Sequence, residues 1–161
     1  MKITVRQLKQ LIKEEVKRSL YKEQASPLAQ MGSMIRAGLQ GFLDDARTRA
    51  RGGAVGVNDV PERSPLNWAE TLTRWSDQLQ TMSDRSGRLP PNWEAVQSAL
   101  GRFAAHYDAS GPGNITAAGS GDLGPGGRHW GLIQNGDQVA MREIPQILAL
   151  LDTATAAGAG R

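Results

Sequence analysis

The chain lacks cysteine altogether, and it lacks lysine after residue 22. The absence of cysteine excludes disulfides, thiolate metal ligands and a cysteine nucleophile. The absence of lysine from the rest of the chain excludes a phosphate-binding or Schiff-base lysine there. Glycine and proline show the reverse distribution, because neither occurs before Pro27. Residues 1–24, which we call the leader, therefore differ in composition from the body that follows.

Long apolar runs are also missing. No segment approaches the roughly 20 apolar residues that span a bilayer, so we expect no membrane contact of that kind. The N-terminus does not have the pattern of a secretory signal, because charged residues interrupt every apolar stretch. We therefore expect a protein that is not secreted by a signal peptide and is cytoplasmic, unless it is carried into a larger particle.

Positive charge is concentrated in the leader. It contains seven basic and three acidic groups, a net charge of +4, which leaves −1 for the rest of a chain whose formal net charge is +3. The body therefore offers little electrostatic attraction for a nucleic acid. Any association with nucleic acid would come from the leader, and we expect it to be weak and sensitive to salt.

The leader has the pattern of an amphipathic helix over about residues 4–23. Thr4 at the cap position and Gln7 three residues later form a capping-box sequence. Apolar residues follow at helical spacing, and the polar side is rich in lysine. The predicted contact face consists of Leu8, Leu11, Ile12 and Val16, with Lys9 and Lys13 beside it. Such a face either packs on the chain's own domain or enters the groove of a protein partner.

The body, residues 25–153, has the pattern of one mainly α-helical domain with four to five helices. A second helix is expected to start at Ser26 and Pro27, a cap followed by a first-turn proline. Two later segments bear tryptophans at helical spacing and should pack as an antiparallel helical hairpin. The predicted apolar stripes are Leu28, Met31, Ile35, Leu39, Phe42 and Ala46, then Trp68, Leu72, Trp75, Leu79 and Met82, then Trp93, Val96, Leu100, Phe103 and Tyr107.

The segments between and after these helices are predicted to be less regular. Residues 54–63 should form a loop with room for a short strand at 54–57. Residues 109–128 are dominated by glycine, alanine, serine and proline, which indicates a flexible or functional loop. Asn135-Gly136 between two short apolar runs predicts a small β-hairpin over residues 130–141. A last helix is expected from Pro145, and residues 154–161 are expected to fray.

Few residues have the spacing of a catalytic or ligand site. Residues 119–124 match G-x-G-x-x-G, but the flanking strand and helix that bind a dinucleotide are missing. Two histidines, His106 and His129, are too few for an ordinary zinc site, and no nucleophile-elbow sequence is present. We therefore predict no catalytic residues, no metal and no cofactor. The alternative is a small ligand-binding or hydrolytic domain that uses the glycine-rich loop with His129 and Trp130.

The first 20 residues carry a family resemblance. Met-Lys-Ile-Thr at residues 1–4, followed by Gln-Leu-Lys-Gln-Leu-Ile-Lys-Glu-Glu at residues 7–15, resembles the short capsid-targeting leader of virion proteins of large tailed phages. The resemblance implies that the leader directs a protein into the prohead by binding scaffold, and that a protease cuts near Glu14 and Glu15. It covers the leader alone.

These patterns together favour a non-enzymatic, phage-type virion or virion-associated protein that its N-terminal helix positions through protein–protein contact. Assembly into a homo-oligomer also stays open. Two alternatives stay open: a ligand site at His129 and Trp130, and weak nucleic-acid association through the basic leader.

Overall fold

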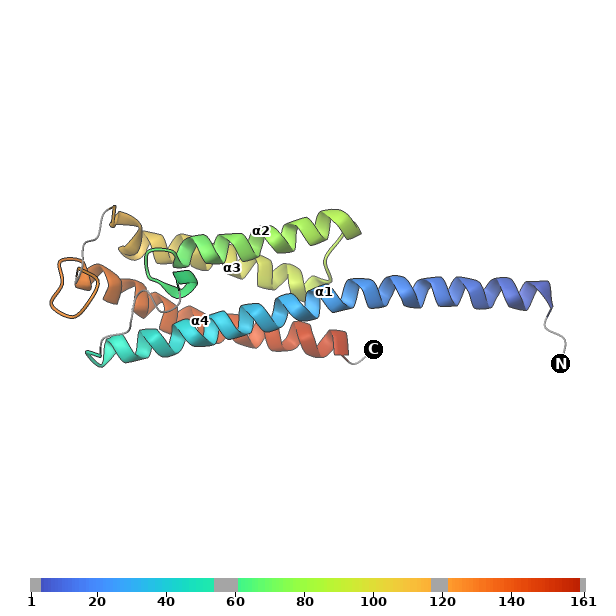
Figure 1. The fold of residues 1–161 in the computed structure, drawn as a ribbon, viewed down its shortest axis with the longest axis horizontal. Helices are drawn as coiled ribbons and strands as arrows, with labels where there is room; N and C mark the ends of the chain where they lie inside the picture. The colour runs from blue at the N-terminus through green and yellow to red at the C-terminus, as the bar shows by residue number, and fades with distance from the viewer. Residues whose placement is uncertain (1–3, 54–60, 117–121, 160–161) are drawn as a thin grey trace.

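The computed structural model describes residues 4–53, 61–116 and 122–159, and these residues are mainly α-helical (Figure 1). The α-helices are α1 (Val5–Ala50), α2 (Trp68–Ser86), α3 (Pro91–Ser110) and α4 (Trp130–Ala159). Two short 3-10 helices, η1 (Pro61–Arg63) and η2 (Pro112–Asn114), lie in the connections. The predicted mainly α class is confirmed. The strand considered at residues 54–57 lies outside the described residues.

α1 is one continuous helix and is longer than the sequence indicated. At its start the Thr4 hydroxyl accepts a hydrogen bond from the Gln7 amide, and the Gln7 side chain accepts one from the Thr4 amide. The predicted capping box is thus confirmed. The predicted helix start at Ser26 and Pro27 is wrong, because α1 runs through Pro27. An internal proline costs about 3 kcal/mol, which packing in the bundle offsets directly afterwards, from Leu28 onward.

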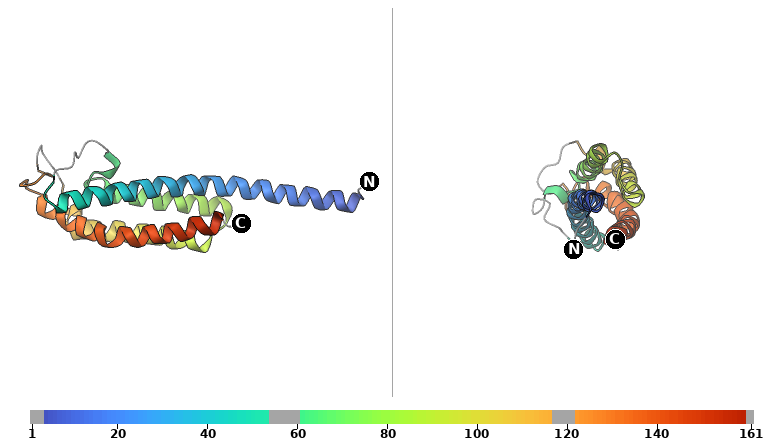
Figure 2. Two further views of the ribbon diagram at one scale, coloured as in Figure 1. Left: turned by 90° about the horizontal axis from the view of Figure 1, so that it is seen from below. Right: turned by 90° about the vertical axis from the view of Figure 1, so that its right-hand side faces the viewer.

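The four α-helices alternate in direction along a bundle (Figures 1 and 2). α1 packs against α4, α4 against α3, and α3 against α2. The predicted antiparallel pairing of the two tryptophan-bearing helices is therefore confirmed in α2 and α3. Figure 2 shows that α1 continues far beyond the end of the bundle at which α4 terminates. The two ends of α1 thus have different surroundings.

Aromatic and aliphatic side chains fill the bundle. Phe42 of α1 stacks on Trp68 of α2 with ring centroids 4.1 Å apart, and Trp68 meets Trp75 edge-on at 5.7 Å. All three predicted stripes contribute to this core, although Leu28 and Met82 are only partly buried. The buried members are Met31, Ile35, Leu39, Phe42, Ala46, Trp68, Leu72, Trp75, Leu79, Trp93, Val96, Leu100, Phe103 and Tyr107.

Glycines in α1 leave room for the indole rings. A Cβ atom on Gly38 would lie 2.3 Å from the Trp75 ring, and one on Gly32 would lie 3.0 Å from the Trp93 ring. Glycine weakens an isolated helix by about 1 kcal/mol relative to alanine. The close approach of the two tryptophans compensates for that cost in this helix.

The predicted β-hairpin at residues 130–141 is wrong, because α4 runs through it. Asn135-Gly136 lies inside the helix, and Gly136 is needed for packing: a Cβ atom there would lie 2.6 Å from Pro112 and 2.7 Å from Tyr107. The polar Asp137 interrupts the apolar pattern of α4, which hid the helix from sequence reasoning. Its buried positions alternate by four and three residues, as Ile133, Asp137, Ala140, Ile144, Ile147, Leu151 and Ala154.

The rest of the C-terminal region is also more helical than the sequence indicated. Pro145 does not start a helix but lies inside α4, on its exposed side. α4 continues to Ala159, through most of the segment that we expected to fray, and Ala154 is buried. In the glycine-rich region, residues 109–110 end α3 and η2 follows. Residues 117–121 and 160–161 lie outside the described residues.

Candidate functional site

An uncovered row of aliphatic side chains lies on the first part of α1. Its members, which we call the apolar strip, are 51% to 71% exposed: Val5, Leu8, Leu11, Ile12 and Val16. They include the four residues predicted as a contact face. Among the residues that the structure describes, they are five of the seven large hydrophobic side chains left exposed. The structure does not pack the strip on the chain's own bundle.

The apolar strip faces away from the side of α1 that enters the core. Leu8 and Ile35 are 27 residues apart, about 7.5 turns at 3.6 residues per turn, so they lie on opposite sides of the helix. From Leu11 to Val16 the strip covers about 140° of the helix circumference. A face of this width is typical of a helix that is buried in a groove or a core.

Basic side chains lie beside the apolar strip. Lys9 and Lys13 are exposed, as is Arg6. Lys13 lies about 6 turns before Ile35 and Arg6 about 8 turns before it, on the line that faces the core further along α1. Beyond the bundle this line of the helix therefore carries charged side chains, and these stay in water because burying an unpaired charge is costly.

His129 and Trp130, the alternative ligand region, stand at the start of α4, and both side chains are half-buried. The His129 amide donates to the Asp122 carbonyl at 3.0 Å, and its carbonyl accepts from the Ile133 amide at 3.0 Å. The backbone of His129 thus helps to begin the helix. Within the described ranges, no three metal-binding side chains gather into a site. Part of the G-x-G-x-x-G match at 119–124 lies outside these ranges.

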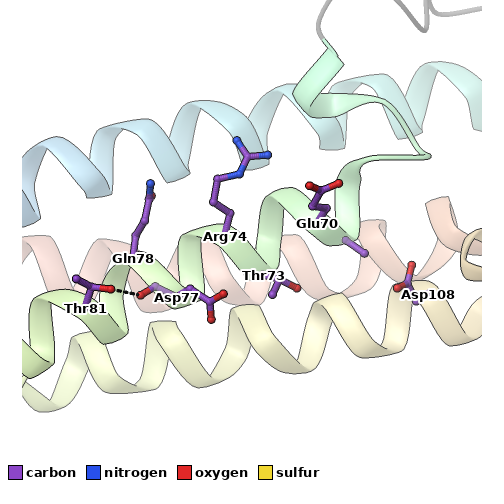
Figure 3. Close-up of a pocket in the computed structure, with 8 residues that line it drawn as sticks. Glu70, Thr73, Arg74, Asp77, Gln78, Thr81 and Asp108 are labelled. Carbon is purple, nitrogen blue, oxygen red and sulfur yellow. Dashed lines mark hydrogen bonds between the residues drawn. The ribbon is translucent and has the colours of Figure 1, made fainter.

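An open groove of about 540 Å³ runs along α2 (Figure 3). Figure 3 shows the side chains projecting from both sides of the helix, with the Thr81 hydroxyl bonded to the Asp77 carbonyl. Partial burial raises the pKa of the Asp108 carboxyl at one end of the groove, although the residue as a whole is exposed. The polar lining residues are all exposed, so the groove holds no fixed arrangement for a ligand. They are Glu70, Thr73, Arg74, Asp77, Gln78, Thr81 and Asp108.

A buried ion pair joins α1 to α4. The Nε and Nη2 atoms of Arg49 donate to the two carboxylate oxygens of Asp137, each at 2.8 Å, and both side chains are almost fully buried. Burial raises the pKa of the Asp137 carboxyl, and Arg49 opposes that rise. Burial lowers the pKa of Arg49, but Asp137, together with Tyr107 and Asp45, more than compensates, so the pKa is raised and the guanidinium stays charged. The pair is enclosed and links α1 to α4 inside the bundle.

Sequence reasoning missed this pair, although a signal for it exists. Arg49 stands where the next apolar residue after Phe42 and Ala46 would be in the stripe of α1. Asp137 occupies the corresponding kind of position in α4. Opposite charges at core positions of two helices indicate a partner for each other, since an unpaired buried charge is costly.

Comparison with protein-family models, with curated proteins and with solved structures finds no match for this chain. Over the described part of the chain, no helix is long and apolar enough to cross a membrane. The geometry therefore defines a kind of surface and no family: an amphipathic helix projects from a four-helix bundle with its apolar side uncovered.

Proposed function

We propose that this chain is a non-enzymatic interaction protein, of the phage virion type, that binds a protein partner through the apolar strip. The observation that carries the proposal is the strip itself: five aliphatic side chains on a capped helix, outside the bundle and more than half exposed. Scattered exposed apolar residues are normal, whereas a contiguous row marks a contact surface. The virion assignment rests on the resemblance of the leader.

The energetics of the apolar strip favour reversible binding. Burying a large aliphatic side chain completely contributes about 1.5–3 kcal/mol. Roughly half of that remains to be gained at each of the five positions, on the order of 5 kcal/mol in all. This gain must offset the loss of translational and rotational freedom on association. Tight binding would therefore need further contacts, for which Lys9 and Lys13 are placed.

Paired variants test the proposal. Leu8→Glu with Ile12→Glu puts two carboxylates into the strip, while Gln7→Glu with Gln10→Glu adds the same charge outside it and preserves the capping box. Each full-length tagged protein is used to capture partners from cells that make it, and mass spectrometry identifies them. We expect the strip variant to lose partners that the control and the wild type retain. Equal capture by all three proteins would contradict the proposal.

The same experiment tests the virion assignment separately. Capsid or scaffold proteins among the strip-dependent partners would support it. Strip-dependent partners that belong to no viral particle would overturn the virion assignment and leave the interaction function in place.

A further inference from the structure

The apolar strip restricts the kind of protein that fits it, an inference that rests on the proposed function. In the described residues, the body of the chain offers no matching surface. Outside the strip, the exposed large hydrophobic side chains in the described ranges are Met34 on α1 and Leu66 between η1 and α2. Two side chains on different elements do not make an apolar groove. The described bundle of a second copy is a poor receptor for the same reason.

A second leader is also a poor occupant. A coiled coil needs apolar residues at alternating spacings of four and three. Val5, Leu8 and Ile12 follow such a series, but its next position is Glu15. The leader carries a net charge of +4, so two leaders side by side repel each other. A strip about 140° wide fits a groove better than the narrow seam between two helices.

A lipid surface fits the strip no better. Helices that lie in a membrane interface are typically anchored by Trp or Phe in addition to Leu, whereas this strip contains aliphatic side chains alone. Glu15 stands one turn after Leu11 on the same line of the helix. A carboxylate would therefore enter the acyl region together with the strip.

The two edges of the strip differ in charge. Lys9 and Lys13 lie beside one edge of the strip, and Gln7 and Glu14 lie beside the other edge. We propose that the occupant is a groove in a different protein, with an aliphatic floor that carries a polar group opposite Glu15, and with carboxylates along the rim that meets Lys9 and Lys13. The floor supplies the apolar contacts, and the rim selects the orientation of the helix by charge.

The position of the strip also fixes the side from which this groove approaches. Leu8 and Ile35 lie on opposite sides of α1, so the groove covers the helix from the side away from the core stripe.

Photo-crosslinking from the full-length chain identifies the occupant. The probe, p-benzoyl-phenylalanine, replaces Leu8 in the strip or, as a matched control, Gln10 on the other side of the helix. Irradiation is done in cells that make the protein, and the crosslinked peptides are sequenced. We expect position 8, but not position 10, to crosslink to one different protein, within an apolar cleft that Asp or Glu residues flank.

Binding to that purified protein then tests the charged rim. Lys9→Glu with Lys13→Glu should weaken binding by about tenfold or more, chiefly through slower association, and added salt should reduce the difference from wild type. Glu14→Gln, on the other edge, should change the affinity less than about twofold.

Each other outcome overturns the inference in a distinguishable way. If a strip-dependent partner binds the lysine variant as tightly as the wild type, the inferred acidic rim is wrong, and the proposed function still holds. Crosslinks between two copies of this chain indicate self-association instead. Sedimentation with phosphatidylcholine–phosphatidylglycerol vesicles, without protein crosslinks, indicates a lipid surface. If position 8 crosslinks no more than position 10 and the chain binds no vesicles, the proposed function itself is wrong.

Discussion

The two parts of α1, residues 5–16 and residues 28–49, have similar apolar patterns and opposite surroundings. In the first part the apolar side chains are more than half exposed, whereas in the second Ile35, Leu39 and Phe42 are fully buried. Helical periodicity therefore shows that a helix has an apolar face. It does not show whether the same chain covers that face.

Features that match a covering surface occur only in the second part. Gly38 leaves room for Trp75, and Arg49 pairs with Asp137. Residues 5–16 contain no glycine, and Lys13 stands on the line that would continue the core. A covered helix face is thus recognised by small residues opposite large ones and by unlike charges at core positions, more than by its periodicity.

The largest expected effect comes from breaking the buried ion pair of the second part. Arg49→Met removes the guanidinium and leaves the Asp137 carboxylate buried without its partner. We expect the free energy of unfolding to fall by about 3–5 kcal/mol, measured by urea denaturation with circular dichroism. Arg47→Met, at an exposed position two residues earlier, should change it by less than about 0.5 kcal/mol.

A double variant separates the charge from the packing. Arg49→Met with Asp137→Leu removes both charges and should recover most of the lost stability, because no unpaired charge stays buried. If the double variant is as unstable as Arg49→Met alone, the loss came from packing, and the ion pair is not what joins α1 to α4.

The same substitution in the two parts of α1 gives the next effect. Leu39 is fully buried, so Leu39→Ala should lower the free energy of unfolding by about 2–5 kcal/mol. Leu8 is half exposed and does not belong to the core cluster, so Leu8→Ala should lower it by less than about 0.5 kcal/mol. Urea denaturation of both proteins measures the contrast. Similar losses would mean that the bundle covers the apolar strip in solution.

A smaller effect tests the room that glycine leaves in the core. Gly38→Ala places a methyl group 2.3 Å from the Trp75 ring, and we expect a net loss of about 1–3 kcal/mol from overpacking. Gly101→Ala in α3 is the control, because its nearest neighbour would be 3.9 Å away. That variant should gain up to about 1 kcal/mol from helix propensity. A gain at both positions would show that Trp75 moves aside without cost.

The next effect depends on pH and arises where the second part of α1 covers Tyr107. The Tyr107 ring lies 5.7 Å from that of Phe42, and its hydroxyl donates to the Pro65 carbonyl at 3.3 Å. Burial and the nearby Asp137 raise the pKa of the phenol well above its ordinary value of 10.0. The folded chain therefore keeps a proton that the unfolded chain releases. This contribution is complete below pH 10 and is lost at about 1.4 kcal/mol per pH unit above it.

Tyr107→Phe should remove this pH dependence. Near pH 7 the variant should be less stable by about 1 kcal/mol, because one hydrogen bond is lost. Above about pH 10 its stability should fall less steeply than that of the wild type. Thermal denaturation over this range gives both slopes. Parallel slopes would contradict a raised pKa at Tyr107.

The sequence predicted those parts of the fold whose signals are local and repeated. Capping residues placed the start of α1, and apolar spacing placed the core stripes of α1, α2 and α3. The same reasoning failed in α4, where Asn135-Gly136 is a strong local hairpin signal. Gly136 is there because Tyr107 and Pro112 approach it. Such long-range contacts are not visible in a local pattern.

The candidate site was predictable to a similar degree. The residues of the apolar strip, with Lys9 and Lys13, follow from helical spacing. Their exposure does not follow from it, because exposure depends on which surfaces the rest of the chain supplies. The pairing of Arg49 with Asp137 likewise needed the fold, since many acidic residues could have been its partner on sequence grounds.

The smallest expected effect comes from removing the first part of α1 altogether. Deleting residues 1–24 removes the apolar strip and leaves Leu28 and Met31, the first core side chains among the residues whose side chains the structure describes. We expect the free energy of unfolding to change by less than about 0.5 kcal/mol. Deleting residues 1–35 also removes Met31 and Ile35, and it should prevent stable folding. Circular dichroism during heating distinguishes the two proteins.

The stability of the 25–161 chain decides whether the first part of α1 supports the bundle. A destabilised 25–161 chain would mean that the first part supports the bundle, and the apolar strip would then need no partner to explain it. An unchanged chain would mean that five exposed aliphatic side chains contribute nothing to folding. Because such a row promotes unwanted association, its presence then requires a role outside the bundle. Loss of the captured partners from the same stable fragment would identify that role as binding.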